Sequence, residues 1–423
     1  MTDTSTRGGN ATSVAIIGAL FFIFGFVTWL NATLIPYLKI SCGLTSNLQA
    51  NLVAFAFYLS YFFMALPSSW ILKKVGFKNG MSLGLLVMAA GALVFIPSAM
   101  TRTFNLFLAG LFIQGTGLSI LQTASNPYVT IVGPIESAAR RISIMGICNK
   151  IAGILSPLVL GFIVLHGIDG LTARLATLDA AAKDAELAAL ASRVIAPYGV
   201  MALVLVGLAL AVRFSPLPEV GGEDDTAAGG AQKTSIFQYP YLFLGVLALF
   251  LYVGAEVVAV DTLILYGTSL GFELSRAKFF SSITLAAMVV GYVVGIVSIP
   301  RFISQSRALK YFSMLGIAFA LVALFTGGFT SVLFIALLGF ANAIMWPAIW
   351  PLAIDGLGRH TKLASAFLIM AILGGALLPL VYGYLADIIG NRQAYWILVP
   401  CYVYILYFAA RGHRVGKTGG SEL

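Results

Sequence analysis

Long apolar runs alternate with short polar segments along almost the whole chain. A helix needs roughly 17–25 mostly apolar residues to cross a bilayer, and about twelve runs reach that length. Backbone polar groups in lipid must be satisfied within their own segment, which favours helices over the short alternating strands of a barrel. We therefore expect an all-α polytopic membrane protein whose spans lie near 14–38, 51–72, 79–99, 104–132, 141–166, 195–213, 241–266, 278–299, 308–327, 331–356, 362–388 and 393–411.

A ten-residue phrase occurs twice, at matching places in the two halves of the chain. Residues 153–162 read GILSPLVLGF and residues 375–384 read GALLPLVYGY, with the glycines, the proline and the Leu-Val pair at the same spacing. Duplication within a transporter explains this pattern, whereas chance is the alternative because these residues are common in membrane helices. Duplication predicts two pseudo-symmetric six-helix bundles, with an N-terminal bundle at 1–213, a cytoplasmic linker at 214–240 and a C-terminal bundle at 241–423.

Charged residues are scarce. They make up 10% of the 423 residues, and 60% of the chain is hydrophobic, whereas soluble domains carry about 25% charged residues. Lys and Arg concentrate in alternate loops, and the positive-inside rule then places both termini in the cytoplasm. The net charge of +9 follows from this topology and does not call for a nucleic-acid partner. The partner that the composition does predict is the lipid bilayer.

Several kinds of catalytic or cofactor site are absent from the sequence. There is no phosphate-binding loop of an ATP-driven pump, no nucleophile elbow and no metal-protease motif. The three cysteines, Cys42, Cys148 and Cys401, have neither metal-ligand nor disulfide-framework spacing. We therefore expect no enzyme, no cofactor and no metal site, so that uphill transport would draw on an ion gradient.

Three ionisable residues lie within apolar spans. Lys150 is about 13 Å along its helix from the cytoplasmic end, so it should face protein or water and have a partner. Glu256 and Asp261 lie in the seventh span, with Glu256 the deeper of the two. Because Lys150 and Glu256 come from opposite halves, we expect them to couple transport to an ion, with Asp261 as the next candidate. The alternative is a static ion pair that joins the halves.

Amide and indole side chains also recur inside the apolar runs. Gln122 and Asn126 share one helix face, and Asn342 and Trp346 form a stripe with Trp350. Amides can donate to and accept from sugar hydroxyls, and indole faces suit the apolar face of a pyranose. The alternative is interhelical hydrogen bonding and packing. The predicted lining of a central cavity is Asn31, Gln122, Asn126, Asn149, Lys150, Glu256, Asn342 and Trp346.

Several segments resemble the fucose:proton symporter family of the major facilitator superfamily, and the resemblance extends over essentially the whole chain. They are residues 24–39 (FGFVTWLNATLIPYLK), 121–130 (LQTASNPYVT) and 252–256 (YVGAE). Residues 145–150 (MGICNK) and 341–351 (ANAIMWPAIWP) look most like the bacterial N-acetylglucosamine permease branch. Glucose/galactose permeases look more distant.

The resemblance implies the major facilitator fold and secondary active import, across a bacterial inner membrane, of a neutral monosaccharide or amino sugar. N-acetylglucosamine is the first choice of substrate, a proton (or sodium) is the coupling ion, and a monomer is the working unit. Fucose permeases carry acids at the positions of Ala32 and Gln122, so their coupling chemistry does not transfer. Alternatives are a glucose/galactose or fucose-type permease, a drug:proton antiporter, and a non-transporting membrane receptor.

Overall fold

The computed structural model describes residues 4–131, 138–215, 217, 235–299, 301–357 and 360–417. In this described part all regular structure is helical, and eleven helical stretches are long and apolar enough to cross a membrane. The longest, Asn47–Thr101, covers two of the predicted spans. It consists of two helices that meet at a kink, where Gly76 has a φ of 78° and a ψ of 169°. The expected all-α polytopic fold is confirmed.

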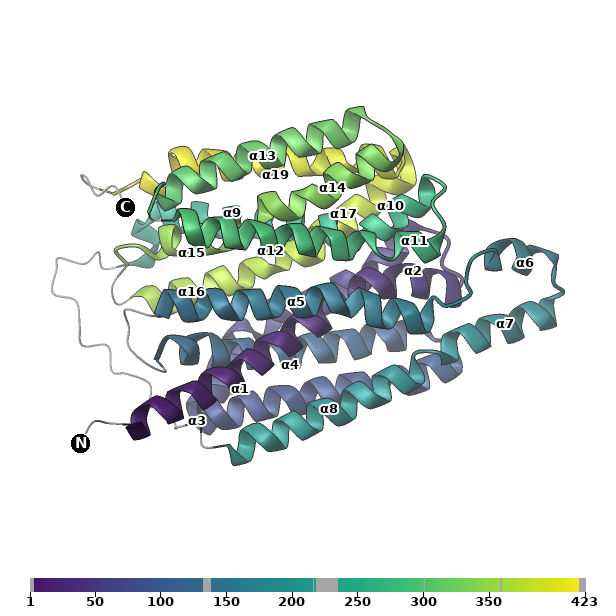
Figure 1. Cartoon of the computed structure of the whole chain (residues 1–423), viewed down its shortest axis with the longest axis horizontal. Helices are drawn as coiled ribbons and strands as arrows, with labels where there is room; N and C mark the ends of the chain where they lie inside the picture. The colour runs from purple at the N-terminus through teal and green to yellow at the C-terminus, as the bar shows by residue number, and fades with distance from the viewer. Residues whose placement is uncertain are drawn as a thin grey trace.

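The first half of the chain forms the helices α1 to α8, which are labelled in Figure 1. Two of them, α6 and α7, extend beyond the rest of the bundle in the loop that follows α5 (Figure 1). The bounds are α1 (Thr4–Trp29), α2 (Asn31–Ser41), α3 (Asn47–Thr101), α4 (Phe104–Ile131), α5 (Ala138–Val164), α6 (Leu171–Thr177), α7 (Ala180–Ser192) and α8 (Ile195–Phe214).

The second half repeats the bundle with more interruptions. Its elements are η2 (Ile236–Gln238), α9 (Pro240–Asp261), α10 (Leu263–Ser269), α11 (Leu274–Ala277), α12 (Phe280–Ser298), α13 (Gln305–Phe325), α14 (Gly328–Asn342), α15 (Met345–Ile354), α16 (Thr361–Met370), η4 (Ala371–Leu373), α17 (Gly374–Ile389), α18 (Asn391–Ala394), η5 (Tyr395–Ile397), α19 (Leu398–Ala410) and η6 (Gly412–Arg414). In Figure 1, the end of α19 and the start of α1 lie at the same end of the bundle, as an even number of crossings requires.

Three of the broken spans are interrupted beside a polar residue. α2 begins at Asn31, α9 ends at Asp261, and α14 ends at Asn342. The sequence predicted continuous helices at 14–38, 241–266 and 331–356, because the apolar pattern runs across each break without change. The backbone at each break keeps right-handed helical φ and ψ values, so the breaks are kinks and not unwound segments. All three polar side chains are buried.

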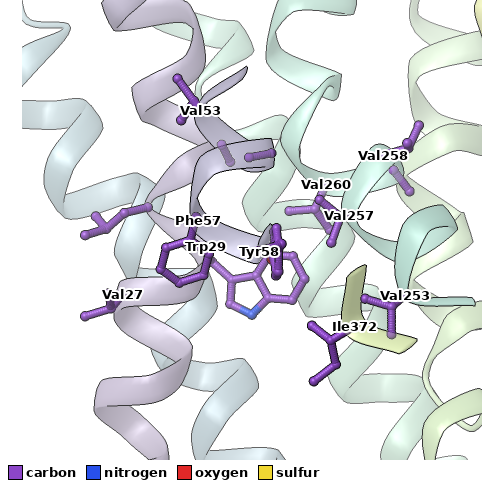
Figure 2. Packing of buried hydrophobic residues seen from close by; sticks show 14 of the residues in the cluster. Val27, Trp29, Val53, Phe57, Tyr58, Val253, Val257, Val258, Val260 and Ile372 are labelled. Carbon is purple, nitrogen blue, oxygen red and sulfur yellow. The ribbon is translucent and has the colours of Figure 1, made fainter. Parts of the chain in front are cut away.

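One large apolar cluster runs through both halves. Trp29, Phe57 and Tyr58 of the first half lie at the level of Val257 and Val260 of α9, as Figure 2 shows. Two helix pairs connect the halves: α5 of the first half packs against α12 of the second, and α3 of the first half packs against α17 of the second. The linker expected at 214–240 falls mostly outside the described residues, and the domain boundaries stay a prediction.

The two halves are joined, at the end opposite the termini, by an acid from each half. Asp387 in α17 accepts hydrogen bonds from the backbone N–H groups of Asn47 and Leu48 at the start of α3, at 2.7 and 2.9 Å. Asp169, which follows α5, accepts one from the N–H of Ser275 in α11 at 3.1 Å. A carboxylate is favourable at a helix N-terminus because it satisfies unpaired N–H groups. Each acid therefore caps a helix of the opposite half.

The duplicated phrase supports these two contacts. Gly161 and Gly383 hold the same position in the two copies. A Cβ on Gly383 would lie 2.8 Å from the carbonyl oxygen of Asn47, and one on Gly161 would lie 3.5 Å from Cδ of Lys278. Both glycines thus pack against the opposite half, as a duplication predicts.

We expect Asp387→Ala to weaken closure at this end by about 1 kcal/mol, because two capping hydrogen bonds are lost. The closed population should fall roughly fivefold relative to the open one. Electron–electron distance measurements between spin labels at exposed Thr45 and Gln393, in a chain without its native cysteines, report the separation of the halves. Asp184→Ala is the control, because Asp184 pairs with Arg102 inside the first half. Identical distance distributions in both variants would contradict the role of Asp387.

Candidate functional site

A buried ion pair connects the two halves in the middle of the bundle. Lys150 Nζ on α5 lies 2.7 Å from Glu256 Oε1 on α9, and each side chain is only 9% exposed. Burying one charge in the membrane is costly, whereas a hydrogen-bonded pair of opposite charge offsets much of that cost. The structure therefore brings together the two residues that the sequence singled out as interior charges.

The indole of Trp29 positions the lysine. Lys150 Nζ lies 4.6 Å from the centroid of the Trp29 ring, which is a cation–π distance. A Cβ on Gly153 would lie 2.4 Å from Cδ1 of this indole, so the glycine one turn along α5 leaves room for the ring. The ammonium is thus held between a carboxylate and an aromatic face.

α1 and α5 approach each other closely beside the ion pair. A Cβ on Gly25 would lie 1.8 Å from the carbonyl oxygen of Asn149, so the two backbones are in contact there. Asn149 Nδ2 donates to the carbonyl oxygen of Phe21 at 3.4 Å, and Ser156 Oγ donates to that of Phe26 at 2.6 Å. In this structure the Asn149 amide therefore binds the two helices to each other.

Tyrosines surround the carboxylate of Glu256. The phenols of Tyr58, Tyr252, Tyr292 and Tyr402 lie close enough to interact with it electrostatically. They come from α3, α9, α12 and α19, so both halves contribute to the surroundings of the pair. Phenols can donate to a carboxylate or to a sugar hydroxyl.

Gln122 joins this group through a further tyrosine. Its Nε2 donates to the hydroxyl oxygen of Tyr61 at 3.3 Å, and the Tyr61 ring stacks with that of Tyr58 at a centroid distance of 6.3 Å. The amide predicted on α4 is therefore connected to the site by two aromatic side chains of α3.

Asn342 and Trp346 approach from the second half. Asn342 is buried, and its Oδ1 accepts a hydrogen bond from the Tyr402 hydroxyl at 2.9 Å. Trp346 is half-buried; its ring lies 5.4 Å from that of Trp350 and 6.5 Å from that of Tyr252. The indoles thus form an aromatic face beside the tyrosines around Glu256.

Several buried polar atoms near the pair have no hydrogen-bond partner among the described residues. They are both side-chain polar atoms of Asn31, Nδ2 of Asn342, Nε1 of Trp29, the Tyr58 hydroxyl and both carboxylate oxygens of Asp261. Unpaired buried polar groups are costly, so these atoms are available to bind a polar ligand or an ion.

Two features fall outside this group. Asn126 lies on α4, but its side chain is outside the described residues. An apolar cleft of about 530 Å³ beside α1, α5 and α8 is lined by residues that include Ala19, Ile144 and Leu208. None of the predicted site residues lines this cleft, so its chemistry does not compete with that of the ion pair.

The sequence analysis missed the tyrosines. Tyr58 and Tyr61 are three residues apart on a predicted span and so share a face, which was the available signal. Aromatic residues are common in membrane helices, however, and only the fold shows that these two face Glu256 and Gln122.

Comparison with known proteins identifies the family. A family model described as Major Facilitator Superfamily matches residues 17–379. The chain is 34% identical to a glucose/galactose transporter of Brucella abortus, over 98% of this chain and 97% of the relative. It is 30% identical to an L-fucose-proton symporter of Escherichia coli, over 93% of this chain and 92% of the relative.

A solved structure of the same superfamily is similar to this fold. That of the major facilitator transporter FucP in the outward conformation matches with a TM-score of 0.73 and 28% identity, and the match covers 96% of this chain and 99% of that one. The relatives are transporters and not enzymes. The chain therefore belongs to the major facilitator superfamily of membrane transporters, in the family that holds the bacterial glucose/galactose transporters and L-fucose-proton symporters.

Proposed function

We propose that this protein imports a neutral monosaccharide together with a proton, by alternating access to a site around Lys150 and Glu256. One observation carries the proposal: a buried ion pair joins the two halves among phenols, amides and indoles with unpaired polar atoms. The names of the relatives, glucose/galactose transporter and L-fucose-proton symporter, support it.

In this proposal the polar and aromatic groups divide the work of binding. The Trp346 indole contacts the apolar face of the sugar ring, as aromatic faces do with pyranoses. Lys150 and Glu256 contribute charge to the same site, and together with Asp261 they couple sugar movement to the ion. The amides that bind sugar hydroxyls are Asn31, Gln122, Asn126, Asn149 and Asn342.

The proposal also concerns which monosaccharide is transported. The motifs at 145–150 and 341–351 favour N-acetylglucosamine, whereas the relatives' names favour glucose and galactose. Since identity to the glucose/galactose transporters extends over nearly the whole chain, we place these two hexoses first and N-acetylglucosamine second.

Counterflow in proteoliposomes tests the function. Proteoliposomes that contain the purified protein are loaded with unlabelled glucose, galactose, fucose or N-acetylglucosamine. Entry of the labelled sugar is followed with and without an uncoupler, and with sodium removed. Sugar exchange together with uncoupler-sensitive accumulation supports the proposal. Dye export without sugar exchange would indicate a drug:proton antiporter, and the absence of any flux would indicate a receptor.

The proposal also fixes orientation. Both termini and the linker at 214–240 lie in the cytoplasm of a bacterial inner membrane, and a monomer is the working unit. The excess of Lys and Arg in alternate loops supports this orientation. A cysteine placed in the linker should resist a membrane-impermeant maleimide in intact cells and react after lysis.

Trp346→Ala should weaken sugar binding about tenfold, because loss of one ring contact of about 1.4 kcal/mol changes a dissociation constant by that factor. The dissociation constant is measured on the purified protein by isothermal titration calorimetry, which does not rely on tryptophan fluorescence. Trp70→Ala is the control, because that indole is 69% exposed and far along α3. Equal dissociation constants for the two variants would remove Trp346 from the binding site.

A further inference from the structure

Asp261 has the least compensated charge of the buried groups described above. The residue has no exposed surface, and neither carboxylate oxygen has a hydrogen-bond partner among the described residues. Glu256, five residues earlier on α9, is paired at 2.7 Å with Lys150. Two acids of one helix thus have opposite surroundings.

The hydrogen-bonding groups next to Asp261 point elsewhere. The Thr262 hydroxyl bonds to the carbonyl oxygen of Val258 and to the Tyr395 hydroxyl. The Ser281 hydroxyl donates to the carbonyl oxygen of Val260. These two hydroxyls are therefore already used, whereas the Tyr58 hydroxyl, which interacts with Asp261, has no hydrogen-bond partner among the described residues.

No cation compensates the charge either, within the part of the chain that the structure describes. The titratable groups that interact with Asp261 are Glu256 on its own helix and Tyr58 on α3, and neither is positive.

Three basic groups toward this end of the bundle are engaged elsewhere. Lys39 donates to Asn47, Lys278 lies over the Phe162 ring, and Arg392 donates to the carbonyl oxygen of Thr326. An ionised Asp261 would thus be shielded from water and would lie near a second acid, Glu256. Burying such an unpaired charge costs much more free energy than burying a charge that is paired.

We propose that Asp261 binds the coupled proton, while Lys150 and Glu256 remain a charged pair in the closed state. This inference rests on the proposed ion-coupled transport, and it reverses the order of candidates that the sequence favoured. A proton passes from hydronium to a carboxylate oxygen of Asp261, forming an O–H bond and leaving water. It returns to water on the opposite side when that bond breaks.

The position of Asp261 explains how proton binding controls closure. It is the last residue of α9, at the break before α10, and α2 packs against both helices. In this proposal, closure of α2 and of Tyr58 on α3 against this end of α9 buries the carboxyl group. The ionised form opposes that burial and the neutral form permits it, so the sugar-loaded protein closes over the site only when the proton is bound.

Transport by the full-length protein in proteoliposomes tests the proposal. Asp261→Asn, which mimics the neutral acid, should keep sugar counterflow but lose accumulation driven by a pH gradient, so that the accumulation ratio falls to about one. Asp184→Asn, at a surface acid that is 67% exposed, should keep both activities. Accumulation by Asp261→Asn at the level of the unchanged protein would overturn the proposal.

A second measurement does not depend on sugar transport. Infrared spectra of the reconstituted protein at neutral pH should contain a protonated-carboxyl band that is absent from Asp261→Asn and present in Asp184→Asn. If Asp261→Asn yields no folded protein, Asp261→Glu should shift the band. A band that neither substitution affects, or no band in the unchanged protein, would overturn the inference. Failure of every sugar to exchange, with the band present, would instead refute only the transported substrate.

Discussion

Replacing Lys150 with methionine is expected to destabilise the folded protein by about 3–5 kcal/mol and to abolish sugar exchange. The substitution keeps an unbranched apolar stem but leaves the Glu256 carboxylate, 9% exposed, without its cation. It also removes the ammonium from the Trp29 face, 4.6 Å away. Because the two partners belong to opposite halves, the unpaired charge opposes each closure of the protein around the site.

A second ion pair in the same chain provides the control. Lys417 and Asp355 also approach to 2.7 Å, but their side chains are 25% and 34% exposed. Exposed pairs contribute less than about 1 kcal/mol, so Lys417→Met should change stability little. Thermal unfolding in detergent and sugar counterflow measure both variants. Similar losses of stability in Lys150→Met and Lys417→Met would show that burial does not strengthen the inner pair.

Adding Glu256→Gln to Lys150→Met separates the pair from its surroundings. Removing both charges leaves no unpaired ion, so the double variant should be more stable than Lys150→Met alone. If the pair serves only to join the halves, the double variant should also recover exchange. We expect recovery of stability without recovery of transport, because the charges also belong to the proposed binding site.

The apolar pattern was enough to predict the helical fold, and its limits have a physical cause. Lipid requires long apolar helices, so span positions can be read from hydropathy. The interruption at Gly76 could be predicted from the polar loop around it, whereas the break beside Asp261 lies inside an apolar run. Such breaks depend on what packs against the helix, which one sequence does not specify.

The candidate site was predictable in part for a similar reason. An interior base needs an interior acid, and that requirement pointed to Lys150 and Glu256 before their distance was known. Asn149 illustrates the limit of such reasoning, because an amide serves equally well for a sugar or for the Phe21 carbonyl that it contacts. The unpaired state of Asp261 could not be read from the sequence, since it depends on neighbours from several helices.

Close packing of α1 on α5 should be as important to this site as its charges. At Gly25 an added Cβ would lie 1.8 Å from the carbonyl oxygen of Asn149, which is backbone and cannot rotate away. Glycine is the residue that lets membrane helices approach this closely. Gly25→Ala must therefore move α1 away from α5, next to the residue that precedes Lys150.

We expect Gly25→Ala to lower stability by about 3 kcal/mol, at the upper end of overpacking costs, and to reduce sugar counterflow at least tenfold. Separating the helices displaces Trp29 and the α5 backbone together, so Lys150 Nζ loses its place between the ring and Glu256. Gly18→Ala is the matched control on the same helix, because its Cβ would meet Met145 Cε at an ordinary 3.8 Å. Thermal unfolding and counterflow of the two variants decide the matter. Equal behaviour would mean that α1 can shift without disturbing the ion pair, and the position of Lys150 would then have to depend on α9 rather than on α1.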